Sequence, residues 1–382
     1  FYRWAMDRLS DQGVIAFITN RSFIDSRTFD GFRRIIQDDF SHAYIVDTHS
    51  DVRANPKISG TKNNVFGIQT GVAMLFLVRK AKAKGEPCQI HYVETPDEWT
   101  AKEKLNWLEE HPLAKIDFRF ISPDAKENWI NILNNNYDSF LPTVNRISNT
   151  NSLFALTNPG TSTNRDSWVY DFEKQCLIDK IIYTVETFNT LIEKGSTTHP
   201  NILKWSHKLI KRFEKKKKLI FDESKIALVS YRPFFLCFYY GDLALSDLLT
   251  TLHFEAYGND LKQQNIVINY TGPNSQKPFL VLASNVLSDL HFVGAGAATQ
   301  CLPLYRYDAD GQRKDNITDW GLGQVREAHG DDSITKEAIF QYTYAVLHNP
   351  AYRKKYDLNL KRDFPRLPSY ADFWRWAAWG KA

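Results

Sequence analysis

The sequence is poor in cysteine and has no long apolar run, and both absences narrow what the chain can be. Its four cysteines, at positions 88, 176, 237 and 301, have neither the spacing of zinc ligands nor that of a disulfide framework. They indicate reduced, buried thiols in a cytoplasmic protein. No apolar run approaches the roughly 20 residues of a membrane helix, and we find no signal peptide. The sequence therefore predicts neither a metal site nor a membrane segment.

Charge and aromatic content bear on the partner of the protein. The 382 residues carry a net charge of only +4, which permits nucleic acid as a partner without requiring it. Aromatic residues make up 14% of the chain, which favours large cores or flat surfaces on which bases stack. A chain of this length usually exceeds one hydrophobic core, so we expect two domains. Because Phe1 already lies inside a helical pattern, we interpret the chain as a piece of a longer protein.

The first 95 residues alternate helix and strand patterns. "FYRWAMDRLS" and "FDGFRRIIQDDF" have the apolar spacing of helices, whereas "VIAFIT" is typical of a buried strand. Strands separated by short helices predict an α/β layer with a largely parallel sheet. The last strands have no helix between them and should therefore pair antiparallel. The other expected strands are "AYIVDTHS", "VAMLFLVRK" and "QIHYVET".

The pattern changes further along the chain. Residues 96–140 are polar and helical, with "EWTAKEKLNWLEEH" as the best helix, and predict a connector. From residue 141 to residue 382, polar turns alternate with strands such as "KIALVS" and "FFLCFYY", which predicts a mixed α+β domain. In "HNPAYRKKY", Asn349 and Pro350 have the order of an N-cap and a first helical residue. The predicted fold class is thus α/β followed by α+β.

The loop before one predicted strand contains an unexpected aromatic residue. In "NNVFGIQTGVAMLFLVRK", residues 63–80, the second half has the pattern of a strand. Phe66 lies before it among amides and glycines, where a plain turn needs no large ring. From spacing alone, Phe66 could pack under the sheet as part of the core. Its alternative role depends on a resemblance.

"GVIAFITNRSFI", "FRRIIQDDFSHAYIVD" and the segment around Phe66, in this order, resemble the second half of the catalytic domain of amino-methylating DNA methyltransferases. The most similar group is the γ-class adenine enzymes. The resemblance implies that residues 1–95 are the C-terminal half of a Rossmann-like sheet with an antiparallel last hairpin. It also implies a target-base pocket lined by Asn20 and Arg21, in which Phe66 stacks on a base flipped out of the duplex.

Most of the remaining chain resembles the C-terminal target-recognition region of single-polypeptide type ISP restriction-modification enzymes. The resemblance implies double-stranded DNA as the partner and a bacterial parent with a nuclease, an ATP-driven translocase and a methyltransferase. The parent would transfer a methyl group from S-adenosylmethionine to adenine N6. The segments that carry the resemblance are "GTSTNRDSWVY", "SYRPFFLCFYY", "GPNSQKPF", "LSDLHF", "CLPLYRYD", "ITDWGL", "IFQYTYAVLHNPAYRKKY" and "LKRDFPRLPSY".

Two hallmarks of the methyltransferase family are missing from the sequence. Its catalytic Asn-Pro-Pro-aromatic tetrad does not occur, because Asn55-Pro56 is followed by Lys57 and Ile58 and lies after the strand that the tetrad should precede. The glycine motif in "VGAGAA", residues 293–298, opens no helix pattern and indicates a loop. We therefore expect no catalytic residue in this chain. S-adenosylmethionine should be bound mainly by upstream sequence, and the chain alone should be inactive.

Several loops have the chemistry of DNA contacts. Arg and Lys read guanine, Asn and Gln read adenine, Asp reads cytosine, and phosphates are bound by Lys, Arg, Ser and Thr. Each loop could equally be a solvated turn held by its own hydrogen bonds. The lysine run 215–218 indicates a solvated helix end, with phosphate contact as the alternative. The candidates are Lys62, Asn63, Asn64, Thr163, Asn164, Arg165, Asp166, Tyr231, Arg232, Asn274, Gln276, Lys277, Asp289 and His291.

Two other functions fit parts of the sequence. The chain could be a stand-alone DNA-specificity module with a degenerate methyltransferase remnant. Alternatively, Glu223-Ser224-Lys225 beside Asp222 has the Glu-x-Lys pattern of metal-dependent nucleases. This pattern is common by chance, and no partner aspartate is placed convincingly upstream of it.

Overall fold

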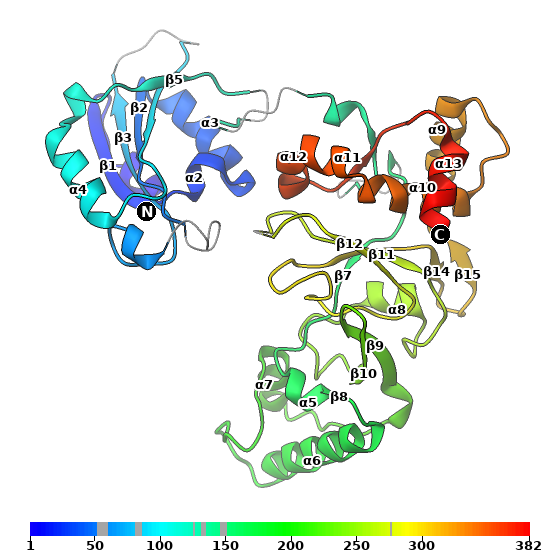
Figure 1. The fold of residues 1–382 in the computed structure, drawn as a ribbon. Helices are drawn as coiled ribbons and strands as arrows, with labels where there is room; N and C mark the ends of the chain where they lie inside the picture. Colours follow the sequence, from blue (N-terminus) through cyan, green and yellow to red (C-terminus); the bar gives the residue numbers. More distant parts are fainter. Residues whose placement is uncertain (52–59, 81–85, 125–126, 131–134, 146–150, 276) are drawn as a thin grey trace. The chain divides into compact units, whose positions relative to one another are not determined.

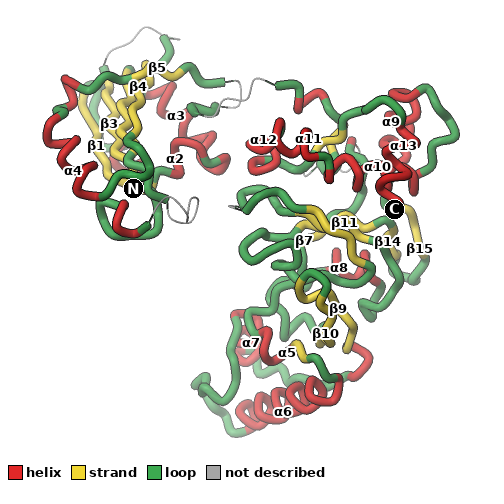
Figure 2. The backbone as a smooth tube through the Cα atoms, in the orientation of Figure 1, coloured by secondary structure: helices red, strands yellow, loops and turns green. Residues whose placement is uncertain are grey.

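The computed structural model describes residues 1–382 except 52–59, 81–85, 125–126, 131–134, 146–150 and 276. The chain divides into two compact units, Phe1–Asn134 and Asn135–Ala382. Figures 1 and 2 show a mixed α/β architecture with several separate sheets. The boundary between the units lies within the segment expected to be a connector, and the division of the chain at residues 95 and 140 stays a prediction.

Unit 1 contains a five-stranded sheet with the order β1-β3-β2-β4-β5. Only β2 and β4 pair in parallel, whereas β3 runs antiparallel to both β1 and β2, and β5 runs antiparallel to β4. The expected largely parallel sheet is therefore wrong, because β3 is inserted between β1 and β2 in the antiparallel direction. β2 and β3, which follow one another in the chain, pair antiparallel as expected of the last strands, whereas β4 lies on the other side of β2 and pairs with it in parallel. The strands are β1 (Gly13–Asn20), β2 (His42–Asp47), β3 (Val72–Arg79), β4 (Gln89–Glu94) and β5 (Arg119–Ile121).

Short helices cover one face of this sheet. Phe23 and Ile36, on α2 and α3, pack with Leu75 of β3 in a common core (Figure 1). β1 forms as predicted but is not fully buried, because it is the edge strand and its Val14 and Ile18 are exposed on the opposite face. The segment expected to be helical holds one α-helix and then β5. The helices are α1 (Tyr2–Met6), α2 (Ser22–Asp25), α3 (Asp30–Asp39) and α4 (Ala101–Glu110).

Unit 2 is built on two larger sheets, β8-β10-β9 and β12-β11-β13-β7, and two small ribbons, β14-β15 and β16-β6. Their strands pair antiparallel. The strands predicted at "KIALVS" and "FFLCFYY" are confirmed as β9 and β10. The bounds are β6 (Leu141–Pro142), β7 (Asn158–Pro159), β8 (Tyr170–Asp171), β9 (Ile226–Arg232), β10 (Phe235–Tyr240), β11 (Val267–Tyr270), β12 (Val281–Ser284), β13 (Gln300–Pro303), β14 (Tyr305–Tyr307), β15 (Arg313–Asp315) and β16 (Arg366–Leu367).

The helices of unit 2 pack on two cores, one around the sheet β8-β10-β9 and one under α9, α10 and α13. The predicted cap is confirmed, because the Asn349 side chain accepts from the Ala351 N–H at 2.9 Å and Pro350 opens the helix. The helices are α5 (Asp166–Val169), α6 (Lys174–Glu193), α7 (His207–Glu214), α8 (Thr251–Tyr257), α9 (Asp319–His329), α10 (Lys336–His348), α11 (Pro350–Lys355), α12 (Asp357–Arg362) and α13 (Phe373–Lys381).

Two further observations concern the membrane and the cysteines. Among the residues that the structure describes, no helix is long and apolar enough to cross a membrane. The four cysteines are free thiols, and three of them are buried as expected. Cys176 differs, since it lies on the exposed first turn of α6.

Candidate nucleic-acid interface

The loop that carries Phe66 is closed by one buried side chain. The Asn64 side-chain oxygen accepts from the Phe66 N–H at 2.9 Å, and its amide donates to the Thr70 carbonyl at 2.8 Å. The tip is thereby turned outward, and Phe66 is 56% exposed beside the exposed Ile68. The alternative that Phe66 packs in the core is therefore wrong.

Asn63 and Asn64 shape this loop from inside. Asn63 is buried at the end of a 3-10 turn, Thr61–Asn63, and its amide donates to the Glu98 carbonyl at 3.1 Å. Both asparagines use their side chains on the backbone, which gives them a positioning role. Lys62 is exposed, so of the three DNA contacts predicted here it alone has a free surface position.

The base of the loop is joined to the ends of β1 and β2. The Arg21 N–H donates to the Gly71 carbonyl at 3.0 Å, and the Arg21 guanidinium binds the buried Asp47 carboxylate at 2.8 Å. Although burial disfavours the charged guanidinium, the carboxylate of Asp47 raises the pKa of Arg21. Asn20 lies next to it, and its side-chain oxygen accepts from the Ser22 N–H at 2.8 Å. The three predicted pocket residues thus lie at one edge of the sheet, with Arg21 as its anchor.

A buried lysine supports the same edge and was not found from the sequence. The Lys104 ammonium of α4 donates to the Thr48 carbonyl at 2.8 Å and to the Ser50 hydroxyl. Ser50 in turn donates to the Asn63 carbonyl at 2.7 Å. Burial lowers the pKa of Lys104. A lysine on a polar helix has the pattern of a solvated side chain, so only the tertiary packing reveals this contact.

In unit 2, residues from three distant segments, the start of α5, the end of β9 and the loop after β12, meet in one place. The buried Asp289 carboxylate accepts from the Arg232 guanidinium at 2.6 Å and from the His291 N–H at 2.8 Å. The Tyr231 hydroxyl donates to Asp166 at 3.0 Å, and the Arg232 guanidinium lies 3.8 Å from the centre of the Tyr231 ring. We name these five residues, Asp166, Tyr231, Arg232, Asp289 and His291, the recognition cluster.

Backbone contacts hold the three segments of the recognition cluster together. The Thr161 N–H donates to the Ser288 carbonyl at 2.9 Å, and the Asp289 N–H donates to the Ser230 carbonyl at 3.0 Å. A Cβ atom at Gly160 would collide with the Asp289 carbonyl. Glycine is therefore required at this position for the loops to approach one another.

The electrostatics of the cluster place a cation at the surface. Burial raises the pKa of Asp289, and the His291 amide and the Arg232 charge oppose this shift only in part. The Arg232 side chain is 36% exposed, whereas the Asp289 carboxylate lies beneath it. The pair therefore presents an oriented guanidinium, which suits a guanine edge or a phosphate.

The loop before α5 holds a second arginine with unused donors. Arg165 is 3% exposed, and its Nε and Nη2 atoms have no hydrogen-bond partner in the described part of the chain. Burial, opposed by Asp247, lowers the pKa of Arg165 to about 10, which leaves the guanidinium charged at neutral pH. Thr163 accepts from the Arg165 N–H at 3.0 Å, and the exposed Asn164 donates to Asp247 at 2.7 Å. All four predicted residues of this loop, Asp166 included, thus lie beside or within the cluster.

The glycine loop connects another predicted loop to the cluster. Ser275 donates to the Gly296 carbonyl at 3.2 Å, and the Gly296 N–H donates to the His291 ring at 3.3 Å. Asn274 and Lys277 are exposed beside this contact, and Gln276 lies outside the described residues. The glycine segment leads into β13, so it is a loop and opens no helix.

The nuclease-like residues are occupied by local contacts. Lys225 pairs with Asp242 at 2.7 Å, Glu223 pairs with Lys174 at 2.6 Å, and the Asp222 side chain accepts from the Ser224 N–H. Within the described ranges, no three His, Cys, Asp or Glu side chains gather as metal ligands would. The Asn55-Pro56 segment lies outside the described residues.

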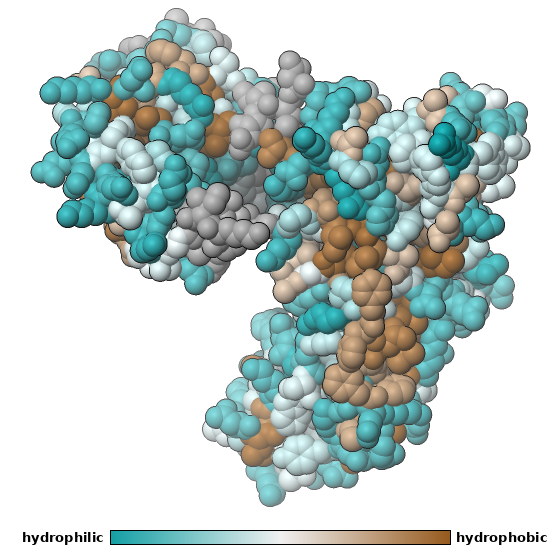
Figure 3. Space-filling model, viewed as in Figure 1, coloured by the Kyte–Doolittle hydropathy of each residue, from teal (hydrophilic) through white to brown (hydrophobic). Residues whose placement is uncertain are grey.

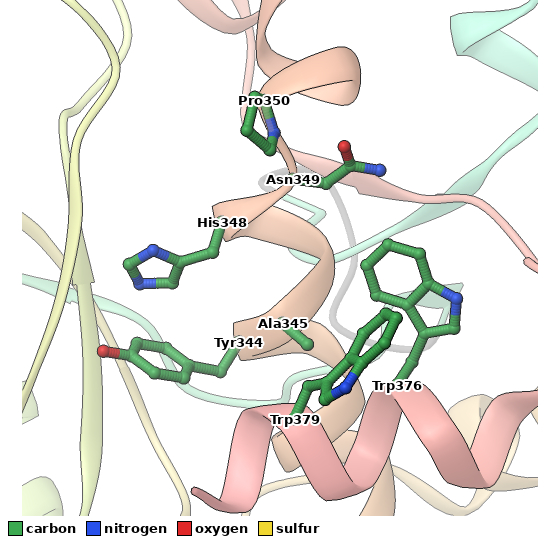
Figure 4. A pocket seen from close by; sticks show the side chains of 7 residues that line it. All are labelled: Tyr344, Ala345, His348, Asn349, Pro350, Trp376 and Trp379. Carbon is green, nitrogen blue, oxygen red and sulfur yellow. The ribbon is translucent and has the colours of Figure 1, made fainter.

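A cavity of about 450 Å³ lies elsewhere in unit 2, at the end of α10. In Figure 4, Trp376 and Trp379 rise from α13 towards α10, whereas Tyr344 and His348 point to the other side of α10. The rings do not converge on one point, and no residue predicted to bind DNA lines the cavity. We therefore place the candidate interface at the recognition cluster.

Comparisons with known proteins identify the family to which the chain belongs. Residues 152–382 match the family described as the Type ISP C-terminal specificity domain. None of the curated proteins compared with the chain matches it. Three solved structures are similar over the whole chain. They are DrdV in a DNA complex (38% identity, TM-score 0.86), a nuclease-deletion mutant of the Type ISP restriction-modification enzyme LlaGI with a DNA substrate mimic (29%, 0.82), and the ATP-dependent Type ISP enzyme LlaBIII bound to DNA (26%, 0.87).

The chain spans only 38%, 30% and 25% of the lengths of these three chains, in the same order. The family inferred from the sequence motifs is confirmed by both comparisons. The larger part of unit 2 falls inside the matched residues, and the recognition cluster lies there. The chain belongs to the Type ISP C-terminal specificity domain family.

Proposed function

We propose that this chain reads a specific sequence in double-stranded DNA and holds the target base while its parent methylates adenine N6. The observation that carries the proposal is the convergence of three segments in the recognition cluster. The cluster lies in residues that match a specificity domain, and the similar solved chains are bound to DNA or to a DNA mimic.

The chemistry of the recognition cluster suits base reading. Arg232 is oriented by Asp289, so it can approach guanine without the entropic cost of ordering a free side chain. The buried Arg165 adds positive charge behind the cluster, and Asn274 and Lys277 add exposed groups on the neighbouring loop. Together they supply both base-edge and phosphate contacts.

The geometry of unit 1 suits a base clamp. Phe66 is exposed on a loop that Asn64 closes and Arg21 anchors, so its ring is held ready to stack on a flipped base. Such stacking contributes on the order of 1–3 kcal/mol. The exposed Val14 and Ile18 of the edge strand β1 form an apolar face that another part of the parent would cover.

The methyl donor proposed for the parent is S-adenosylmethionine. The glycine motif at residues 293–298 is packed against Ser275 and leads into a strand, which does not suit a cofactor loop at the start of a helix. We propose that other segments of the parent bind S-adenosylmethionine, alongside the nuclease and the translocase.

The test is Phe66→Ala in the intact parent, with Ile68→Ala in the same exposed loop as the matched control. Removing the ring should slow methylation about fivefold to a hundredfold and lower the fluorescence of 2-aminopurine placed at the target base. The control should change neither. If Phe66→Ala leaves both unchanged while variants of the recognition cluster still weaken binding, the chain is a DNA-specificity module without a base clamp.

A further inference from the structure

The turn between β9 and β10 contains a strained phenylalanine. Pro233 and Phe234 form the two-residue connection between the paired Arg232 and Phe235. Phe234 has a φ of 61°, a left-handed conformation that normally selects glycine or asparagine at this place in a turn. Its side chain is nevertheless 97% exposed, so it contributes nothing to the core. Phe234 thus has an unfavourable backbone conformation and makes no compensating core contact, which points to a role other than stabilising the fold.

The turn stands at the end of an apolar surface. Figure 3 shows hydrophobic residues gathered over β9 and β10. We name Leu228, Phe234, Phe235 and Leu236, which are all exposed, together with Phe172, the hairpin patch. Phe172 is 68% exposed, and its ring lies 5.0 Å from that of Phe235. A contiguous apolar surface of this kind marks a contact with a partner.

We propose that Phe234 is a wedge that inserts between neighbouring base pairs of bound duplex DNA. The proposal rests on the proposed function of the recognition cluster. Phe and Pro are side chains with which DNA-binding proteins unstack a base step, and Pro233 and Phe234 occupy the tip together. Arg232, which precedes the tip, belongs to the recognition cluster, so a duplex read by the cluster lies within reach of the turn.

The position of the Arg232 guanidinium beside the turn favours DNA over a protein as the partner of Phe234. A protein would cover the whole hairpin patch, including Phe172. A duplex that contacts the oriented Arg232 guanidinium would also meet the tip of the turn and would leave Phe172 in water. The reason is that DNA phosphates attract the guanidinium, whereas contact with an apolar sheet face is unfavourable for them. Bound DNA should therefore bury Phe234 and leave Phe172 exposed, whereas a bound protein should bury both side chains.

The experiment uses the 382-residue chain and two variants of one position. Phe234→Gly suits the backbone of the turn and removes the ring, whereas Phe234→Trp keeps a flat wedge. The probe is a duplex that the wild-type chain enriches from a library with a randomised core, carrying 2-aminopurine at successive positions. Phe172→Ala is the matched control, since it removes an exposed ring of the same patch.

We expect Phe234→Gly to leave the melting temperature unlowered, to weaken binding of the enriched duplex about fivefold to a hundredfold, and to abolish the 2-aminopurine signal of an unstacked step. Phe234→Trp should restore both, and Phe172→Ala should change neither. Wild-type affinity and an unchanged signal in Phe234→Gly would overturn the wedge.

The remaining outcomes also decide the question. If the wild-type chain enriches no duplex, the proposed function itself fails. If Phe234→Gly and Phe172→Ala both spare DNA binding but both weaken association with other segments of the parent, the hairpin patch is a protein-docking face and the wedge is refuted.

Discussion

Substitutions of Asp289 should separate the effect of this residue on protein stability from its effect on DNA recognition. Asp289→Asn keeps the shape of the side chain and removes its charge. The carboxylate is buried, and burial raises its pKa despite the Arg232 guanidinium and the His291 amide, so its site disfavours the charged form. The Arg232 side chain is 36% exposed and therefore screened, which limits the pair to about 1 kcal/mol. We expect the unfolding free energy of unit 2 to change by about 1 kcal/mol or less.

Asp289→Ala is the contrasting substitution. It also removes the acceptor of the His291 N–H, and an orphaned buried donor costs about 1–3 kcal/mol. The loops around Asp289 cannot close over the gap, because Gly160 already lies against the Asp289 backbone. The Ala variant should therefore be less stable than the Asn variant by about 1–3 kcal/mol.

DNA binding should follow a different order from stability. Without its carboxylate partner, Arg232 loses its fixed orientation in both variants, and affinity for the enriched duplex should fall by about 1–3 kcal/mol, which is about fivefold to a hundredfold. Fluorescence anisotropy measures the affinity, and amide hydrogen exchange of α10 peptides reports the stability of unit 2. A loss of more than about 3 kcal/mol of stability in the Asn variant, or an unchanged affinity, would refute the reasoning.

Three further predictions concern other positions. Lys104→Met leaves the Thr48 carbonyl without its donor and should lower the urea-unfolding free energy of unit 1 by about 1–3 kcal/mol. Burial lowers the pKa of His253, which contacts the Pro159 carbonyl, to about 4. As the pH falls, His253 is protonated in the unfolded chain at a higher pH than in the folded chain. The free energy of unfolding should therefore fall by about 3 kcal/mol between about pH 6.5 and about pH 4. His253→Gln should reduce this pH dependence. Lys277→Ala should reduce the slope of log affinity against log salt by about 1, and an unchanged slope would exclude a phosphate contact.

Local patterns in the sequence predicted local structure well. The apolar runs of β9 and β10 and the Asn349 cap depend on near neighbours, so the sequence indicates them directly. The sequence also identified Phe66 as an unusual aromatic in a polar loop, and the structure shows it exposed.

Pairings between distant residues could not be predicted in the same way. The place of β3 between β1 and β2 depends on where the chain re-enters the sheet after β2, and no local sequence pattern indicates this. Arg232 and Asp289 appeared as members of separate loops, because only Gly160 and the crossing backbone bonds bring them together. The sequence pattern did not single out Phe234, because its unusual features are its positive φ angle and its exposure, which only the structure shows.

The most direct test of the central claim is hydroxyl-radical footprinting of the side chains with and without the enriched duplex. Tyr231, His291 and Phe234 are oxidisable and partly or fully exposed, so DNA bound at the recognition cluster should protect all three. Trp374 and Trp379, which are exposed on α13, should be oxidised equally in both states and serve as the internal reference. Equal oxidation of the three cluster and turn residues with and without bound DNA would contradict the account.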